Sequence, residues 1–418
     1  MYDYIYKYII YSKYVRKAKM KGKLKMEYRI SDKLKNLKPS AIREIFKSLT
    51  NPEIIAFAAG NPAAESFPTE YIQKKCAEIL ETAPITALQY GITEGYPALR
   101  TAVKARLKDA FGIGRDFDET IITSGGQQGL ELTCKVMCNE GDVIISENPS
   151  FIGALNAYRS NGAKIVGVDM EDDGMNIELL EKALKENPNA KLIYTIPTFH
   201  NPMGITTSYE KRKQIYALAK KYGVLILEDN PYGELRFSGE EIPTIKSMDE
   251  DGIVCYSGSY SKVLSSGMRI GFLCAPASVM AKIVVAKQVE DVHTNNLCQM
   301  VCESFVTSDE YLPHLDKIRD LYRRKCGLML DAMDKHFPKN VKYTRPEGGL
   351  FLWCTLPEGR DLTEFVAEAL ANKVAVVPGT AFNCDTLAPS NSFRLNYSTP
   401  SDEQILRGIE ILGKILSK

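Results

Sequence analysis

The residues whose types could support catalysis lie in four short segments, each directly after an apolar run typical of a β-strand. These segments are the glycine-rich turn 123–129, Asn201-Pro202-Met203-Gly204, Glu228-Asp229-Asn230-Pro231-Tyr232 and Gly258-Ser259-Tyr260-Ser261-Lys262. In open α/β sheets, functional residues gather in the loops that follow the carboxyl ends of strands. A lysine amine is a nucleophile and a proton carrier, and a carboxylate can pair with a ligand N–H group. The segments therefore predict one site for covalent and acid–base chemistry.

The glycine-rich turn has the properties of a phosphate site. Glycines allow close backbone approach, and the following helix would present free N–H groups and the positive end of its dipole. The turn does not match G-x-G-x-x-G, and no G-K-[ST] follows it. Each of the four segments also has an ordinary structural explanation by itself, such as a turn, a helix cap or a solvated lysine. Only their order and spacing together favour a functional interpretation.

The elements that must position these segments alternate along the chain. From about Pro68 onward, amphipathic helical patterns alternate with short apolar strands. This alternation predicts an α/β fold with a large domain, whose mostly parallel sheet is flanked by helices, and a smaller α+β domain. A long helical stretch is expected at about 277–335. Four parts are predicted. Residues 1–26 form a basic, tyrosine-rich extension expected to be disordered, and residues 27–65 form a segment over the active site. Residues 66–305 form the large domain and residues 306–418 the small C-terminal domain.

The order and spacing of the segments resemble those of the fold-type-I pyridoxal-phosphate aminotransferases of class I/II. Asn201 and Asp229 are 28 residues apart, and Lys262 follows Asp229 by 33. The resemblance extends from about residue 39 to the C-terminus and includes the motifs N-P-x-G, D-x-P-Y, S-x-S-K-x(6)-R and S-F-R-L-N-Y, in that order. The segments P-S-x-I-R and G-x-P before them are similar to the 2-aminoadipate/kynurenine-type branch of broad specificity.

The resemblance implies pyridoxal 5′-phosphate as the cofactor, an electron sink that the protein must hold, tune and serve with one mobile proton. Lys262 would form the internal aldimine and then carry the proton as general base and acid. Asp229 would pair with the ring N–H, while Tyr232 and Asn201 would hydrogen-bond the ring oxygen O3′. Phe151 would stack on the ring, where relatives often have tyrosine or tryptophan.

The resemblance also implies which residues bind the anionic groups of cofactor and substrate. The phosphate would be held by Gly126, Gln127, Ser259 and Arg269, and Ser261 would also belong to the cofactor-binding residues. Gly126 stands where relatives frequently have serine or alanine, so a hydroxyl contact is lost and the backbone amides remain. Arg394 would clamp the substrate α-carboxylate with a bidentate fork. The substrate site would also include Gly60, Asn201 and Arg43, with Arg43 capping a distal carboxylate.

Tyr90 resembles the tyrosine that reaches the phosphate from a neighbouring subunit, so the active unit would be a homodimer. The implied function is a ping-pong aminotransferase that moves an amino group from an L-amino acid of 2-aminoadipate, aromatic or branched-chain type to a 2-oxo acid, foremost 2-oxoglutarate. The same residues also suit a pyridoxal-phosphate lyase for β-elimination or decarboxylation. A regulator with a DNA-binding module is disfavoured, because only about 30–38 residues precede the matching part. The sequence does not select the amino donor.

Composition excludes several classes of partner. The 418 residues carry 53 Lys+Arg and 52 Asp+Glu, a net charge of +1, which predicts neither nucleic-acid nor membrane binding. Residues 1–25 alone have eight basic residues and one acid, a net +7, which leaves −6 for the remainder. The ten cysteines and four histidines form no four-ligand metal set. Scattered cysteines in apolar contexts favour free thiols and a cytoplasmic location.

Overall fold

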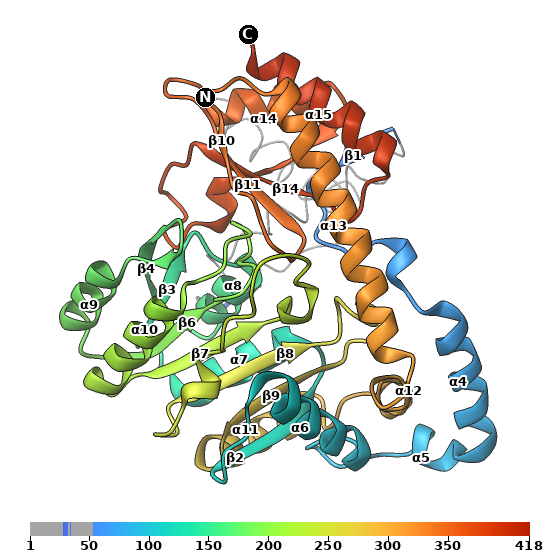
Figure 1. The fold of residues 1–418 in the computed structure, drawn as a ribbon. Helices are drawn as coiled ribbons and strands as arrows, with labels where there is room; N and C mark the ends of the chain where they lie inside the picture. Colours follow the sequence, from blue (N-terminus) through green and yellow to red (C-terminus); the bar gives the residue numbers. More distant parts are fainter. Residues whose placement is uncertain (1–27, 32–33, 35–52) are drawn as a thin grey trace. The chain divides into compact units, whose positions relative to one another are not determined.

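The computed structural model describes residues 28–31, 34 and 53–418 (Figure 1). Contacts divide the chain into two compact units, Met1–Leu37 and Lys38–Lys418. The eight-stranded and four-stranded sheets, and the cavity described below as the candidate active site, lie in the second unit. The predictions made for the extension 1–26 and for Arg43 fall outside the described residues.

An eight-stranded sheet forms the centre of the second unit (Figure 1). Its strands in chain order are β2 (Asp118–Thr123), β3 (Val143–Asn148), β4 (Lys164–Glu171), β5 (Gly174–Met175), β6 (Ala190–Thr195), β7 (Leu225–Asn230), β8 (Val254–Ser259) and β9 (Gly271–Pro276). Their spatial order is β2-β9-β8-β7-β6-β3-β4-β5. The five strands from β8 to β4 are parallel, whereas β9 is antiparallel to both of its neighbours and β5 is antiparallel to β4. The predicted α/β fold with a mostly parallel sheet is confirmed.

Helices cover both faces of this sheet because parallel strands need crossover connections. In chain order they are α4 (Thr69–Thr82), α5 (Pro84–Leu88), α6 (Pro97–Phe111), α7 (Gly126–Met137), α8 (Ile152–Ser160), α9 (Ile177–Glu186), α10 (Tyr209–Tyr222), α11 (Ala277–Glu290) and α12 (Asn296–Val306). One buried cluster joins α7, α8 and α11 to the sheet, and another joins α9 and α10 to it. The short 3-10 helices are η1 (Ala64–Ser66), η2 (Gly233–Leu235), η3 (Lys246–Met248) and η4 (Gly379–Phe382).

Alternation along β7 sends two neighbouring carboxylates to opposite faces of the sheet. Leu227 packs in the cluster of α7 and α8, whereas Ile226 packs in the cluster of α9 and α10. Successive side chains of a strand point to opposite faces. Asp229 therefore shares the α7 face with Leu227, and Glu228 shares the α10 face with Ile226.

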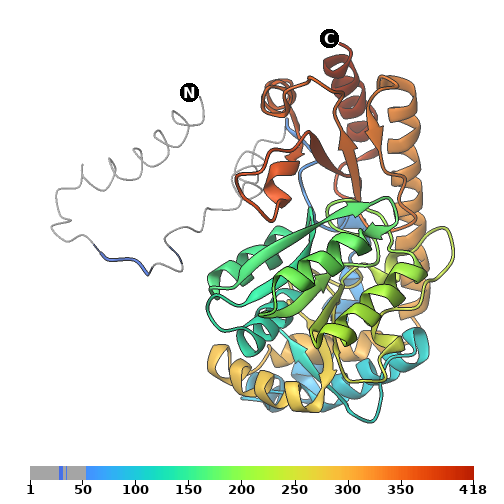
Figure 2. The same ribbon diagram turned by 90° about the vertical axis from the view of Figure 1, so that its left-hand side faces the viewer.

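The C-terminal region has its own four-stranded antiparallel sheet, with helices around it (Figure 2). Its strands are β10 (Lys342–Tyr343), β11 (Phe351–Thr355), β13 (Val377–Pro378) and β14 (Ser392–Asn396), in the order β10-β11-β14-β13. Its helices are α13 (Tyr311–His336), α14 (Leu362–Ala371) and α15 (Asp402–Leu416). The short strands β1 (Ile55–Ala56) and β12 (Val374–Ala375) form a separate parallel pair. The domain boundary placed at 305/306 stays a prediction.

The long helical stretch predicted at about 277–335 consists of three helices. The first break follows α11, where Val292 has a φ of +65° that no helix accommodates. The side chain of Asn295 then accepts a hydrogen bond from the Cys298 amide at 2.9 Å and begins α12. Such N-capping satisfies a backbone donor that a continuous helix would satisfy internally. A second break separates α12 from α13.

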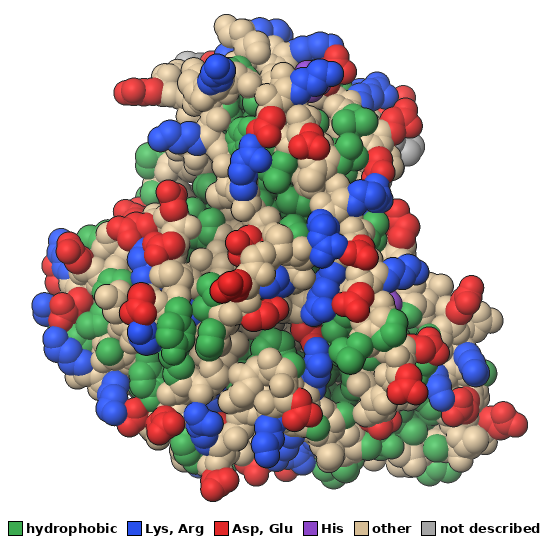
Figure 3. All heavy atoms as spheres, viewed as in Figure 1, with side chains coloured by type: hydrophobic (Ala, Val, Ile, Leu, Met, Phe, Trp, Pro, Cys, Tyr) green, Lys and Arg blue, Asp and Glu red, His purple; other side chains and the backbone are tan. Residues whose placement is uncertain are grey.

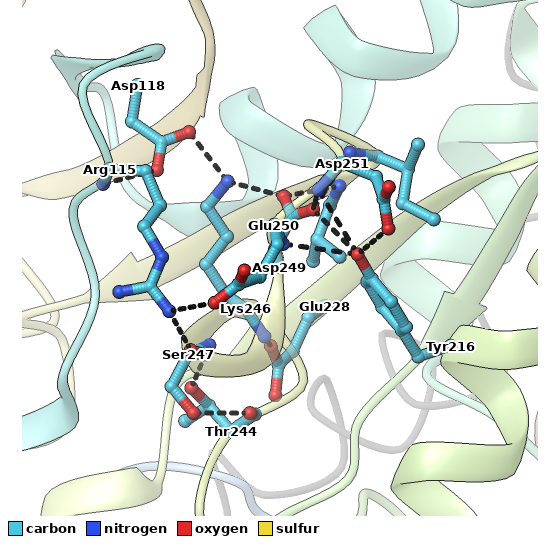
Figure 4. Close-up of polar contacts among 12 residues, drawn as sticks. Arg115, Asp118, Tyr216, Glu228, Thr244, Lys246, Ser247, Asp249, Glu250 and Asp251 are labelled. Carbon is cyan, nitrogen blue, oxygen red and sulfur yellow. Dashed lines mark hydrogen bonds and ion pairs between the residues drawn. The ribbon is translucent and has the colours of Figure 1, made fainter. Parts of the chain in front are cut away.

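A buried ionic network lies at the amino ends of β2 and β8 (Figure 4). Lys246 Nζ contacts Asp118 Oδ1 at 2.6 Å and Asp249 Oδ2 at 2.9 Å, and these three side chains are almost fully buried. Asp249 also accepts hydrogen bonds from the amides of Ile253 and Val254. The same loop is fixed to β7, because the Glu228 carboxylate accepts the Ile245 and Lys246 amides at 3.0 and 2.7 Å.

The surface shows no field of a single charge on the face seen in Figure 3, where acidic and basic side chains are interspersed. Within the described residues, no helix is both long enough and apolar enough to cross a membrane. Nor do the described His, Cys, Asp and Glu side chains form any group of three or more suited to a metal ion.

Candidate active site

A cavity of about 320 Å³ lies at the carboxyl ends of β6, β7 and β8, beside the start of α7. Residues of all four segments singled out in the sequence line it, together with residues near residue 60 and from the small sheet. It contains every described residue of the predicted site except Tyr90: Gly60, Gly126, Gln127, Phe151, Asn201, Asp229, Tyr232, Ser259, Ser261, Lys262, Arg269 and Arg394.

Lys262 follows β8 and extends its amine into this cavity. Its Nζ donates a hydrogen bond to the Gly60 carbonyl at 2.9 Å, and no carboxylate of the described residues forms an ion pair with it. Burial lowers the pKa of the amine to about 8, and the positive charges of Arg394 and Arg269 act in the same direction. A substantial fraction of this amine is therefore neutral and nucleophilic near physiological pH.

Asp229 lies at the end of β7 and is 4% exposed. Its Oδ2 accepts a hydrogen bond from the Tyr194 hydroxyl at 2.9 Å. Burial raises the pKa of Asp229 to about 7; the Tyr194 hydrogen bond lowers it and the negative charge of Glu147 raises it. A cationic N–H group in the cavity would favour the ionised carboxylate, so Asp229 is suited to pair with a protonated ring nitrogen.

The turn between β2 and α7 lies against Arg269, and their hydrogen-bond donors suit an anion. Gly125 has a φ of +80°, and a Cβ there would lie 2.1 Å from Arg269 Nη2, so only glycine fits. The Arg269 guanidinium donates to the Ser124 carbonyl and to Ser261 Oγ, both at 3.3 Å. The Ser261 amide in turn donates to Ser259 Oγ at 3.1 Å. Because the first N–H groups of α7 have no partner within the helix, the guanidinium and these amides together favour a phosphate.

Arg394, on β14, provides a second positive charge in the cavity. It is 3% exposed, and its guanidinium donates to Asn201 Oδ1 at 2.9 Å and to the Ala58 carbonyl at 3.1 Å. Its carbon Cζ lies 4.2 Å from the centroid of the Phe351 ring. Burial lowers the pKa of Arg394 to about 10, and no described residue forms a hydrogen bond with its Nε. A buried cation with an unpaired donor is suited to bind a carboxylate.

Aromatic side chains form part of the cavity wall beside these charged groups. Phe151 precedes α8, and a Cβ at Gly153 would lie 2.4 Å from its ring, so glycine makes room for it. The Gln127 side chain also depends on this position, because its Nε2 donates to the Gly153 carbonyl at 2.9 Å. Tyr232 packs edge-on against Phe351 with ring centroids 5.8 Å apart. Burial raises the pKa of Tyr232, which therefore keeps its proton and can donate it in a hydrogen bond.

Tyr90 is the described residue of the predicted site that this chain does not bring to the cavity. It is 81% exposed, and its ring meets His293 with centroids 5.9 Å apart. Exposed apolar side chains occur near it in sequence and at the end of α11: Ile85, Leu88, Ile92, Val285, Val289 and Val292.

Several residues of the cavity were not anticipated from the sequence. They are Asn61, Leu130, Ile196, Pro231, Ser266 and Phe351. Phe351 ends the run Gly348-Gly349-Leu350-Phe351, and these two glycines were the only feature of the sequence that could have indicated its role. Asn61 was already part of the G-x-P motif, but nothing in the sequence distinguished it from Gly60.

A second unanticipated feature is a buried carboxylate near Asp229. Glu147, at the end of β3, accepts hydrogen bonds from Thr195 Oγ1 at 2.6 Å and from the Ile196 amide at 2.8 Å. His200 Nε2 lies 3.1 Å from it, and both side chains are almost fully buried. Because Ile196 and Asn201 belong to one loop, Glu147 fixes the segment that presents Asn201 to the cavity.

The chain matches the family described as aminotransferase class I and II over residues 52–412. Aromatic-amino-acid aminotransferase 1 of Thermococcus litoralis is 39% identical over 399 residues, which are 94% of this chain and 95% of that one. Kynurenine aminotransferase of Pyrococcus horikoshii, solved with PMP and kynurenine, has a TM-score of 0.90 at 36% identity and covers 95% of this chain and 98% of its own. Alpha-aminoadipate aminotransferase of Thermus thermophilus, solved with N-(5′-phosphopyridoxyl)-L-leucine, has a TM-score of 0.86 at 36% identity, with 93% and 97% covered.

Proposed function

Because the chain belongs to the class I and II aminotransferases, we propose that its cavity binds pyridoxal phosphate with Asp229 at the ring nitrogen and Arg269 at the phosphate. The enzyme is a pyridoxal-phosphate-dependent transaminase of fold type I that acts on an amino acid and a 2-oxo acid. The cavity residues fit this cofactor, because they offer an arginine with helix amides for the phosphate and, for the ring, a buried carboxylate that no cation of the described residues pairs with. When bound, the cofactor withdraws electrons from the substrate carbon that loses a proton.

Lys262 is the residue that attaches the cofactor and moves the proton. The observation that carries this proposal is an amine in the cavity, with a pKa of about 8, whose hydrogen bond within the described part of the chain goes to the Gly60 carbonyl. Near neutral pH such an amine can take a proton from a substrate carbon and return it to another atom, as general base and then acid. Arg394 and Arg269 keep its pKa low without forming any bond to it.

The other residues orient the ring and the substrate. Tyr232 and Asn201 are proposed to hydrogen-bond the ring oxygen, and Phe151 to cover one face of the ring. Arg394 is proposed to hold the α-carboxylate of the substrate through its unpaired Nε and a neighbouring N–H group. The Asn201 side chain links ring binding to substrate binding, because it already accepts a hydrogen bond from Arg394 at 2.9 Å. Gly60 is proposed to line the substrate site beside this arginine.

The amino donor is proposed to be an L-amino acid of the 2-aminoadipate, aromatic or branched-chain type, with 2-oxoglutarate as acceptor in a ping-pong reaction. Two features support this choice. Phe351, Tyr232 and Leu130 are among the residues that line the cavity, and their apolar surface suits a large side chain. Similar proteins are named for aromatic amino acids, kynurenine and aminoadipate. A distal carboxylate contact from Arg43 stays a prediction.

A panel of donors against 2-oxoglutarate tests the proposed function. The purified holoenzyme is assayed for glutamate formation with 2-aminoadipate, kynurenine, phenylalanine, leucine and alanine. We expect glutamate and the matching 2-oxo acid in equal amounts, with at least one large donor exceeding alanine in kcat/KM. Release of ammonia and pyruvate without glutamate would instead indicate a lyase. A preference for alanine would contradict the proposed substrate class.

The active unit is proposed to be a homodimer in which Tyr90 reaches the phosphate of the partner subunit. The support is the exposed apolar group around Tyr90, which includes Leu88 and Val289 at 71% and 81% exposure. Analytical ultracentrifugation should give twice the chain mass of 46.7 kDa. The Tyr90→Phe variant should stay dimeric and bind pyridoxal phosphate a few-fold more weakly, since one hydrogen bond is lost. A monomer with full affinity would contradict the proposal.

A cytoplasmic location is proposed as well. All ten cysteines are free, and Cys134, Cys255, Cys274, Cys302 and others are buried in apolar surroundings. Free thiols persist in a reducing compartment, whereas an oxidising one favours disulfides. Fractionation of the producing cells, with the enzyme followed by its activity, tests this proposal.

A further inference from the structure

The turn that is proposed to bind the phosphate has little support from its own residues. Gly125 stands at the N-cap of α7 and has no side chain to cap the helix. Its left-handed backbone conformation is costly to hold for a flexible residue, because glycine loses more conformational freedom than any other residue on folding. The support must therefore come from elsewhere in the chain.

That support comes from Asp291, one residue past the end of α11. Its Oδ2 accepts hydrogen bonds from Ser124 Oγ at 2.6 Å and from Gln128 Nε2 at 2.8 Å. Ser124 precedes Gly125, and Gln128 follows Gln127, so one carboxylate holds the turn from both sides. The Ser124 amide also donates to Gln128 Oε1 at 2.8 Å, which closes a ring of hydrogen bonds around the turn.

Lys287 neutralises this carboxylate from one helical turn earlier. Its side chain is fully buried, and Nζ lies 2.8 and 2.9 Å from the two oxygens of Asp291. The same Nζ donates to Gln128 Oε1 at 2.9 Å and to Thr294 Oγ1 at 3.1 Å. Because the pair has no net charge, Asp291 can support an anion site without repelling its ligand.

Arg269 connects the network to the ligand. Its Nη2 donates to the Ser124 carbonyl at 3.3 Å, so the serine that Asp291 holds also positions the guanidinium proposed to bind the phosphate. Asp291 itself does not line the cavity. Its effect on a ligand therefore passes through Ser124, Gln128 and the turn between them.

We infer that Asp291, neutralised by Lys287, is a positioning residue for the cofactor phosphate. It holds the turn at 124–128 in the conformation that directs the first amides of α7 and Arg269 at one anion. This inference rests on the proposed function, in which that turn binds the phosphate. It assigns no role to Asp291 in binding the cofactor ring or the substrate.

The neighbouring carboxylate Glu290 offers a matched control. It ends α11 and pairs with Lys135 at 2.8 Å, where the two side chains are 22% and 40% exposed. Its contact with Gln128 Nε2 is long, at 3.4 Å, and it has no bond to Ser124. Glu290→Gln and Asp291→Asn thus remove equal charge from adjacent positions, but Asp291→Asn weakens the bonds of 2.6 and 2.8 Å that form the ring, whereas Glu290→Gln alters only the long contact of 3.4 Å to Gln128.

The test compares the affinity of the apoenzyme for pyridoxal phosphate with its affinity for pyridoxal, which lacks the phosphate, by equilibrium dialysis. Asp291→Asn should raise the Kd for pyridoxal phosphate about tenfold, the loss expected when a hydrogen bond to a charged group is weakened. Its Kd for pyridoxal should not change, and Glu290→Gln should match the unaltered protein with both ligands. Equal losses for the two ligands would overturn the inference, because a general loss of structure affects both.

A double-mutant cycle tests the route through Ser124. Ser124→Ala should also weaken pyridoxal phosphate selectively, and the double variant with Asp291→Asn should lose no more than Asp291→Asn alone. Losses that multiply would overturn this route. An unaltered apoenzyme that binds pyridoxal as tightly as pyridoxal phosphate would contradict the phosphate assignment of the proposed function. Selective binding that Asp291→Asn leaves intact would contradict only the inference.

Discussion

Two lysines lie at opposite ends of the strands of the large sheet, and their surroundings shift the pKa of the same type of side chain in opposite directions. Lys246 lies at the amino ends of β2 and β8, between the carboxylates of Asp118 and Asp249. Lys262 lies at the carboxyl end of β8, where its amine contacts a carbonyl and faces two arginines. Burial alone would lower the pKa of Lys246, but its two carboxylates raise it above the usual value, whereas the pKa of Lys262 falls to about 8.

The difference separates charges that maintain the fold from charges that await a ligand. Around Lys246, each charge has a partner within the chain, and the backbone amides of Ile253 and Val254 complete the network. Around Lys262, the described residues provide no hydrogen-bond partner for Arg394 Nε and no cation paired with Asp229. Since unpaired buried charge costs free energy, a cavity that gathers such groups is a candidate functional site.

Removing the amine of Lys262 should have the largest effect on catalysis. Lys262→Ala should lower kcat by on the order of 10⁴-fold or more, because attachment and proton transfer are both lost. Borohydride should no longer fix the cofactor to the protein. Because no carboxylate is left unpaired, urea unfolding should show undiminished stability. Turnover retained by the variant would contradict the role of Lys262.

Removing the amine of Lys246 should have the reverse effect. Lys246→Met leaves Asp118 and Asp249 buried without a cation and should lower the free energy of unfolding by about 3–5 kcal/mol. The folded fraction should keep its kcat, because the network lies away from the cavity. Urea denaturation gives the free energy of unfolding of Lys246→Met and of the control Lys135→Met, which removes only a partly exposed ion pair. Equal free energies of unfolding for the two variants would contradict the structural role of Lys246.

The unpaired donor of Arg394 leads to a prediction about substrate binding. Arg394→Lys keeps the charge and loses the planar fork, so kcat/KM should fall about a hundredfold, mostly through KM. The control is Arg324→Lys, since Arg324 pairs with Asp402 on the surface and should tolerate the change. Steady-state kinetics with varied amino donor gives both parameters. An unchanged KM would argue against Arg394 as the carboxylate clamp.

The depressed pKa of Lys262 predicts how cofactor attachment depends on pH. Only the neutral amine attacks the aldehyde, so attachment should accelerate about tenfold per pH unit below pH 8 and level off above it. The rate of recombination of apoenzyme with pyridoxal phosphate, followed by absorbance between pH 6 and 10, measures this. A rate that kept rising about tenfold per pH unit up to pH 10 would mean that the cavity does not lower the pKa of the lysine from its usual value of 10.5.

The strand-end motifs were the part of the site that general principles could predict, because parallel strands bring their carboxyl ends to one edge of a sheet, whereas Gly60, Phe151 and Arg394 came from the family resemblance. The resemblance assigned Asp229, and not Glu228, to the site, but the residue types alone did not distinguish these two adjacent acids. Glu228 and Asp229 are equivalent by position, and only the packing of β7 sends Asp229 to the α7 face. Phe351 and Asp291 were missed for a related reason: their role depends on tertiary contacts with residues far away in the chain.

Arg394 makes the completed site depend on the last part of the chain to be synthesised. Its partners Ala58 and Asn201 precede it by 336 and 193 residues. The large sheet ends with β9 at residue 276, so its strands are complete while more than a hundred residues still await translation. A nascent chain at that stage holds Lys262 and Asp229 but lacks the arginine for the substrate carboxylate. Truncation from the C-terminal end would therefore remove substrate recognition while sparing the strand ends that present the cofactor-binding residues.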